Sequence, residues 1–150
     1  MKTLFTAIAL SIATPAFADC DLDKQVEVLA LNMYHEARGE GSDAMQMVGE
    51  VTLNRVEHPR YPDDICSVVY QRKQFSWTHT RKDHTPHEKE VWETALELAE
   101  NLVTGEIGLF NNGATHFLNP TTVRRIPSWA RKFEQVGQIG NHVFYEKPHG

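Results

Sequence analysis

The sequence has few features that would attach its folded part to a membrane or to nucleic acid. After the first residues, no apolar run approaches the roughly 20 residues that a membrane-spanning helix needs. Basic residues are in the minority, because 15 Lys and Arg stand against 20 Asp and Glu and give a net charge of −5. Binding to a phosphate backbone needs a basic surface. We therefore expect neither a membrane nor nucleic acid as partner, although the sign of a local cleft can differ from that of the whole chain.

The sequence also lacks the motifs of several enzyme classes. It contains no nucleophile elbow, no phosphate-binding glycine loop and no Cys–His hydrolase arrangement. There are eight histidines but no His-Glu-x-x-His pattern. His79, His84 and His87 fall in a charged loop, whereas zinc ligands usually come from ordered elements with short spacings. We expect no metal and no cofactor, and a metal-dependent enzyme using these three with His116 and His142 stays as a rival.

The first 18 residues have the order of a secretory signal. Lys2 supplies a positive start, Leu4–Ile12 is almost purely apolar, and Ala16 and Ala18 are the small residues that a signal peptidase reads. The apolar run is too short to span a bilayer. We therefore predict cleavage after Ala18 and export to the periplasm or the cell wall, with residues 19–150 forming one monomeric domain.

Cysteine is scarce as well, since the chain has only Cys20 and Cys66. In an oxidising compartment an even pair most simply forms a disulfide. On the chain-entropy model this bond would contribute about 3–4 kcal/mol. Two free buried thiols or a metal pair are the alternatives, and the spacing does not indicate metal.

Apolar residues three and four positions apart predict that the domain is mostly helical. One stripe covers residues 22–37, a second begins at a capping Ser42 and ends near His58, and a third begins at Pro86 and ends at Gly105. The polar stretch 74–85 is expected to be a loop.

Two shorter features complete the predicted elements. Asp63 or Asp64 can cap a short helix that carries Ile65. In the last third, Ala114–Leu118 and His142–Tyr145 have the composition of short adjacent strands, separated by a loop with Pro and Trp. The predicted class is therefore a helix-dominated α+β fold with a small β element late in the chain.

Glu36 has the most informative position in the sequence. At about 100° per residue it lies on the flank of the apolar stripe of the first helix, near its C-terminus, while His35 points away from that stripe. Burial and the negative end of the helix dipole both raise the pKa of a carboxyl group there. Glycosidic cleavage needs such a protonated acid. The alternative is that Glu36 pairs with Arg38 or Arg55.

Two other acids are weaker candidates. Glu40 lies across the turn at Gly39 and is either a second acid or a solvated loop charge. Glu50 lies inside the second helix, where structural pairing with a partner is expected.

Aromatic and polar side chains alternate in the loop 74–78, as they do in sugar-binding clefts. The alternatives are that Phe75 and Trp77 anchor the loop in the core and that Trp129 covers the core. The candidate substrate-binding residues are Phe75, Ser76, Trp77, Thr78, His116 and Trp129.

Several blocks of the sequence resemble the SleB/CwlJ-type cell wall hydrolase domain of spore cortex-lytic enzymes. They are Tyr34–Glu40, Gly49–Val56, Ile65–Gln71, Gln74–Thr78, Ala114–Phe117 and Ile139–Tyr145. The resemblance implies a lysozyme-like, lytic transglycosylase type of fold and cleavage of peptidoglycan glycan strands. It also implies that Glu36 is the catalytic acid. His35 departs from the family, in which many members have a small residue at that place.

The expected activity is cleavage of the β-1,4 bond between N-acetylmuramic acid and N-acetylglucosamine. A transglycosylase needs Glu36 alone, first as acid and then as base, whereas in a hydrolase Glu40 is the candidate for positioning water. The sequence does not choose between them. A glycan-binding module without turnover and a metal-dependent amidase or peptidase are the rivals.

Overall fold

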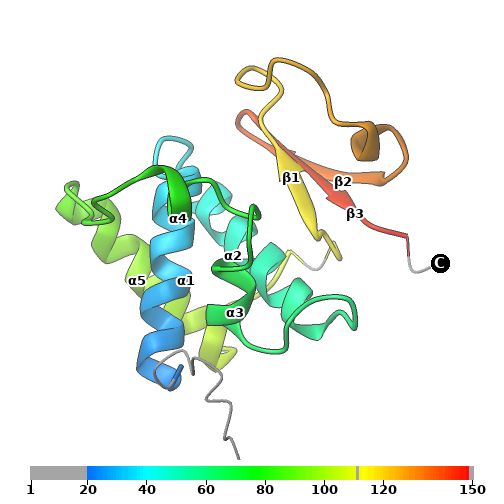
Figure 1. Cartoon of the computed structure of the whole chain (residues 1–150). Helices are drawn as coiled ribbons and strands as arrows, with labels where there is room; N and C mark the ends of the chain where they lie inside the picture. The colour runs from blue at the N-terminus through cyan, green and yellow to red at the C-terminus, as the bar shows by residue number, and fades with distance from the viewer. Residues whose placement is uncertain (1–19, 111, 149–150) are drawn as a thin grey trace, which may run out of the picture.

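The structure, a computed structural model, describes residues 20–110 and 112–148, so the predicted signal lies outside the described residues. Its elements are α1 (Leu22–Ala37), α2 (Ser42–Glu57), α3 (Ile65–Val69), α4 (Trp77–Thr80), α5 (Lys89–Thr104), β1 (His116–Leu118), a 3-10 turn (Ser128–Arg131), β2 (Glu134–Ile139) and β3 (His142–Glu146). Figure 1 shows a helical body, α1–α5, with the sheet β1–β3 beside it. The predicted helix-dominated α+β class is confirmed.

The helical body is built around α1. Asp21 caps this helix by accepting a hydrogen bond of 2.8 Å from the Lys24 backbone N–H. The buried face of α1 includes Val28, Leu29 and Met33, which are fully shielded from solvent between the other helices. Leu29 and Met33 belong to the predicted stripe, because residues four apart share one side of a helix, whereas Val28 lies outside that stripe.

Helix α2 lies close to α1 and α5 because of Gly49. A methyl group built on Gly49 would lie 2.6 Å from Leu102 Cδ1 and 3.0 Å from Met33 Sδ. The absent side chain therefore lets the three helices approach each other. None of the helices in residues 20–110 and 112–148 is long and apolar enough to cross a bilayer.

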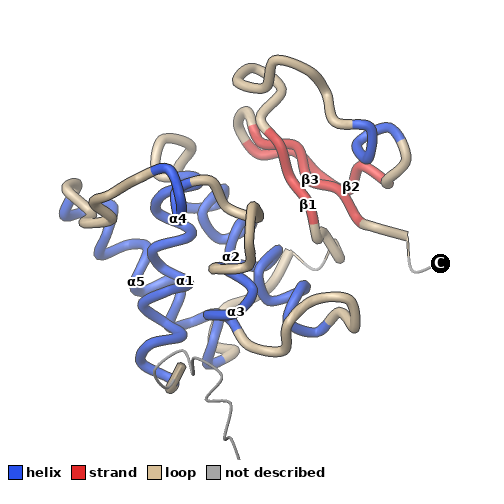
Figure 2. The backbone as a smooth tube through the Cα atoms, viewed as in Figure 1, coloured by secondary structure: helices blue, strands red, loops and turns tan. Residues whose placement is uncertain are grey.

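The sheet is antiparallel in the order β1-β3-β2, as the strands in Figure 2 show. Phe117 in β1 pairs with Phe144 in β3, and Phe144 is fully buried in a small second core with Met47 and Val51 of α2. The strand β2 has a register shift between Gln135 and Gly137. The sheet thus rests on α2 through few apolar side chains.

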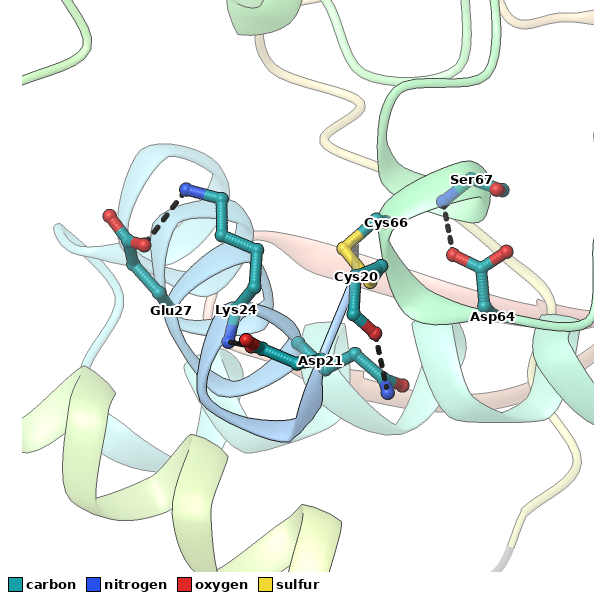
Figure 3. Close-up of a disulfide and its surroundings, with 8 residues drawn as sticks. Cys20, Asp21, Lys24, Glu27, Asp64, Cys66 and Ser67 are labelled. Atoms are coloured by element: carbon teal, nitrogen blue, oxygen red, sulfur yellow. Dashed lines mark hydrogen bonds and ion pairs between the residues drawn. A yellow bond between two sulfur atoms is a disulfide. The ribbon is translucent and has the colours of Figure 1, made fainter. Parts of the chain in front are cut away.

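The predicted disulfide between Cys20 and Cys66 is confirmed. It joins the segment before α1 to α3, with 6.2 Å between the two Cα atoms, and closes a separation of 46 residues (Figure 3). Next to it, Asp64 caps α3 by accepting a 2.8 Å hydrogen bond from the Ser67 backbone N–H. The disulfide fixes the segment before α1 to α3.

Several predicted boundaries differ from the structure. Ser42 is the first residue of α2 rather than its cap, because Gly41 occupies the cap position with φ 90°. Helix α5 begins at Lys89, after an extended Glu88, and not at Pro86. The predicted loop 74–85 contains α4, and the loop between the two predicted strands contains β2, which the sequence analysis missed.

Candidate active site

A cavity of about 930 Å³ lies where the helical body meets the sheet. Its walls come from the end of α1, from the buried Arg55 of α2, from the loop 73–76, from β1 with the loop that follows it, and from His142 of β3. A cavity of this size can hold several sugar-sized groups.

Glu36 lines this cavity from the last turn of α1. Its carboxyl group has no ion pair and no hydrogen bond with any side chain or backbone group in the described part of the chain. Burial raises the pKa of Glu36 to about 7, and the positive charge of Arg55 opposes this shift. About half of the Glu36 side chains therefore carry a proton at pH 7, and the carboxyl group lines a cavity.

The two arginines that the sequence offered as partners for Glu36 are used elsewhere. Arg38 forms an ion pair with Glu88, with 2.9 Å between Nε and Oε2. The Arg55 guanidinium donates a 2.7 Å hydrogen bond to the Thr115 carbonyl. Arg55 therefore acts on Glu36 only through its charge, at longer range.

The last turn of α1 is held in place by the segment before α5. The Tyr34 hydroxyl accepts hydrogen bonds of 3.2 Å from the backbone N–H groups of His87 and Glu88, and it donates one of 3.1 Å to the Glu88 carboxylate. With the Arg38–Glu88 pair, these contacts fix the turn that presents Glu36.

His35 corrects the prediction that it points away from the folded core. Its ring stacks on Trp77 with centroids 4.7 Å apart, and its Nε2–H donates a 3.0 Å hydrogen bond to the His84 carbonyl. Burial, first of all, lowers the pKa of His35. The helical wheel failed because the segment around His84, remote in sequence, covers that side of α1.

Glu40 lines the same cavity but is held by the turn between β2 and β3. Its two carboxylate oxygens accept hydrogen bonds from Asn141, at 3.0 Å from the backbone N–H and at 3.2 Å from Nδ2. The backbone hydrogen bond from Asn141 is the main cause that lowers the pKa of Glu40. Glu40 is thus an ionised group with both oxygens engaged.

His142, the next residue, is buried and lines the cavity beside Glu36. Its pKa is lowered by burial, while the charge of Glu40 and the nearby Glu36 backbone carbonyl act in the opposite direction. The end of α1 and the start of β3 therefore meet at the cavity.

Of the predicted substrate-binding residues, Phe75, Ser76 and Trp129 line the cavity, and the structure brings them together with Glu36 and Glu40. Phe75 is also buried, as expected if it anchors the loop in the core.

Three predicted residues lie elsewhere. Trp77 belongs to the core, because only 2% of it is exposed and its indole N–H donates a 2.9 Å hydrogen bond to Asn32 Oδ1. Thr78 lines a separate, smaller hollow. His116 packs against Trp129 and Phe133, with ring centroids 4.9 Å apart in both pairs, and burial is the main cause that lowers its pKa to about 4.

Sequence reasoning did not identify every residue of the cavity wall, and the side chains that it missed include His35, Arg55 and His142. Each lies in a block of the sequence that resembles the hydrolase family. This resemblance could have indicated Arg55 and His142, whereas His35 departs from the family at its position. Glu50, in contrast, has the expected structural partners, since it accepts hydrogen bonds from Gln46 Nε2 and the Phe110 backbone N–H.

In the part of the chain that the structure describes, no group of histidines is spaced to hold a metal ion. Within residues 20–110 and 112–148, the one group of three side chains spaced to hold an ion is Cys20, Asp64 and Cys66. Its two sulfur atoms are bonded to each other, so they cannot act as thiolate ligands.

Comparison with known families gives one match that covers most of the chain. A family model described as Cell Wall Hydrolase matches residues 39–145. This span begins just after Glu36, so the match by itself says nothing about that residue.

Curated relatives include the spore cortex-lytic enzymes of Halalkalibacterium halodurans and Bacillus subtilis. The first is 30% identical over 123 residues, which are 81% of this chain and 34% of the relative. The second is 25% identical over 124 residues, which are 83% of this chain and 38% of the relative. The chain thus spans little more than a third of the length of these relatives.

Two solved structures share the fold. The catalytic domain of the Bacillus cereus SleB protein has a TM-score of 0.65 and 25% identity, with 81% of this chain and 89% of that chain covered. The catalytic domain of the germination-specific lytic transglycosylase SleB from Bacillus anthracis has a TM-score of 0.66 and 24% identity, with 84% and 96% covered. The predicted type of fold is confirmed.

Proposed function

The chain belongs to the cell wall hydrolase family, and from this membership and the geometry of the cavity we propose that it cleaves the glycan strands of peptidoglycan. The bond cut is the β-1,4 bond between N-acetylmuramic acid and N-acetylglucosamine. One observation carries the proposal. Among the described residues, Glu36 has no ion pair or hydrogen bond to its carboxyl group, which lines a large cavity and has a pKa raised to about 7.

Glu36 is the proposed general acid. Cleavage of a glycosidic bond leaves negative charge on the departing oxygen, and a carboxylic acid that is still protonated near neutral pH can neutralise that charge. Burial supplies the proton affinity, and the charge of Arg55 keeps the pKa from rising further. After transfer of the proton, the same charge stabilises the Glu36 carboxylate.

The lytic transglycosylase route fits the cavity better than hydrolysis does. In that route the Glu36 carboxylate takes the proton of the muramic C6 hydroxyl while this oxygen attacks C1, which gives a 1,6-anhydro product. A hydrolase would need a group to activate water. Glu40 is the other acid that lines the cavity in the described part of the chain, and both of its oxygens are engaged by Asn141.

The remaining walls are proposed to bind the sugars. Phe75 and Trp129 supply aromatic faces that suit the C–H surface of a sugar ring, and Ser76 supplies a hydroxyl group for polar contacts. Trp77, Thr78 and His116 are proposed to act on these walls indirectly, through packing, since they do not line the cavity.

The place of action is proposed to lie outside the cytoplasm. Residues 1–18 would be a cleaved signal and residues 19–150 the catalytic domain. The disulfide Cys20–Cys66 supports this, because such bonds persist in oxidising compartments.

The test is digestion of purified peptidoglycan by the mature protein and by its Glu36→Gln variant, followed by mass spectrometry of the soluble products. We expect anhydromuropeptides from the wild type and a loss of about a thousandfold in rate for Glu36→Gln, within the range for loss of a general acid. Glu97→Gln, an exposed change of the same kind on α5, is the matched control and should keep full activity.

The other outcomes are equally clear. Reducing muropeptides from the wild type would keep Glu36 but make the enzyme a hydrolase. Equal rates for wild type and Glu36→Gln would contradict the role of Glu36. Binding without cleavage would indicate a glycan-binding module, and freed peptides on intact glycan, lost with a chelator, would indicate a metal-dependent amidase.

A further inference from the structure

The sheet is attached to the helical body at both ends of its central strand. Near the end of β3 that carries Tyr145, Asn54 and Arg55 of α2 donate hydrogen bonds of 2.9 Å and 2.7 Å to the carbonyls of Ala114 and Thr115. The opposite end of β3 lies at the turn of the β2–β3 hairpin, and there the polar contact comes from Glu40.

The contact between Glu40 and Asn141 joins residues 101 positions apart. It uses both carboxylate oxygens, each with its own donor on Asn141. Such a two-point contact fixes the direction of the hairpin as well as its distance, because rotation about either hydrogen bond breaks the other.

The turn is shaped to admit the carboxylate. Gly140 has φ 56°, in the left-handed region, and a methyl group placed on it would overlap Glu40 Oε2. Glycine therefore provides both the backbone conformation and the space that the contact needs.

The same hairpin brings His142 into the cavity next to Glu36. His142 follows Asn141 directly, is buried, and lies near the Glu36 backbone carbonyl, which influences its pKa. Movement of Asn141 away from Glu40 would therefore also move His142 away from the backbone of the catalytic turn.

We propose that Glu40 is a positioning residue that fastens the tip of the β2–β3 hairpin to the end of α1. The contact holds the sheet side of the cavity in position relative to Glu36. The inference rests on the proposed function for its catalytic readout. This role differs from the one considered for a hydrolase, in which Glu40 would position water. A carboxylate whose two oxygens already accept hydrogen bonds is a poor base.

The first experiment compares Glu40→Ala, Asn141→Ala and the double variant by kinetics on peptidoglycan. We expect kcat/KM to fall about tenfold for Glu40→Ala and less for Asn141→Ala, which keeps its backbone N–H, with much of each loss in KM. The double variant should be no worse than Glu40→Ala, because both changes remove one contact. Glu134→Ala, an exposed acid on the same hairpin, is the matched control and should retain wild-type kinetics.

A reciprocal exchange separates positioning from acid–base chemistry. Glu40→Lys combined with Asn141→Asp reverses the direction of the contact and leaves no carboxylate at position 40. If Glu40 positions the hairpin, the pair restores most of the activity that Glu40→Lys alone loses. If Glu40 is a base, the pair stays as inactive as Glu40→Lys, kcat of Glu40→Ala falls by hundreds-fold, and the proposal is wrong.

A second readout does not depend on activity. In the wild type, the amide proton of Asn141 should shift as Glu40 titrates below its ordinary pKa, and hydrogen exchange at this amide should be slow. Both features should vanish in Glu40→Ala. If the wild type leaves peptidoglycan intact, the proposed function is wrong. If the chemical shift of the Asn141 amide does not change as Glu40 titrates, this inference is wrong.

Discussion

The helical body and the sheet contribute differently to the cavity. The body has a large core around α1, a disulfide, and close helix packing at Gly49, and it carries Glu36. The sheet has a small core around Phe144, and polar contacts to Asn54, Arg55 and Glu40 join it to the helical body. The difference teaches that Glu36 lies on the part with the larger core, while the opposite wall of the cavity is held by a small core and a few hydrogen bonds.

The largest expected effect concerns the proton on Glu36, which belongs to the body. Because its pKa is raised to about 7, activity that depends on the protonated acid should fall about tenfold per pH unit above that value. The measurement is the rate of product release between pH 5 and pH 9, in the wild type. A rate that stays level to pH 9 would contradict the assignment.

The same shift has a consequence for stability. The folded chain keeps a proton on Glu36 that the unfolded chain releases at lower pH. The free energy of unfolding therefore decreases as pH rises from 4.5, the ordinary pKa of a glutamate, to about 7, and Glu36→Gln should abolish this decrease.

Removal of the disulfide measures how much this bond contributes to the free energy of unfolding. Replacing Cys20 and Cys66 together by serine should lower the free energy of unfolding by about 4 kcal/mol, as the chain-entropy model gives for a loop of this length. Urea denaturation measures the loss. At low urea, the folded fraction should still cleave peptidoglycan, because neither cysteine lines the cavity. A variant that is folded but inactive would contradict this separation.

Arg55 connects the two regions, and Arg55→Met should affect both. The Thr115 carbonyl loses its donor, which should cost about 2 kcal/mol. The positive charge that lowers the pKa of Glu36 is also lost, so the decline of activity should move to higher pH. Arg72→Met, at an exposed position, is the control for loss of charge. A decline at unchanged pH would exclude an electrostatic role for Arg55.

The smallest expected effect lies at the segment that covers the last turn of α1. Glu88→Gln removes the charge of the Arg38–Glu88 pair but keeps an oxygen for the Tyr34 hydroxyl. Because both side chains are partly exposed, the loss should be about 0.5 kcal/mol, measured as a shift of the urea midpoint. A loss above about 2 kcal/mol would mean that this pair contributes more than surface pairs usually do.

The sequence predicts the body better than the sheet for a physical reason. Helices α1, α2 and α5 have long apolar stripes, and their ends were predicted within a few residues. The strand β2 has no regular alternation, because its register shifts between Gln135 and Gly137 and none of its residues is fully buried. Short strands without a clear buried face carry little signal.

For residues of the site, too, positions set by one local element could be predicted better than positions set by contacts between remote segments. Glu36 could be predicted, because its position depends on one helix and its own apolar stripe. Trp77 and His35 could not, because their surroundings depend on contacts between remote segments, with Asn32 for Trp77 and with the segment around His84 for His35. The engagement of Glu40 by Asn141 is equally remote in sequence.

The central claim is that Glu36 is the catalytic acid and that Glu40 only positions the hairpin. The most direct test is a parallel digestion of peptidoglycan by wild type, Glu36→Gln and Glu40→Gln, with mass spectrometry of the products. We predict anhydromuropeptides from the wild type, none above background from Glu36→Gln, and the same anhydromuropeptides at a modestly reduced rate from Glu40→Gln. Glu40→Gln as inactive as Glu36→Gln, or anhydromuropeptides released by Glu36→Gln, would contradict the account.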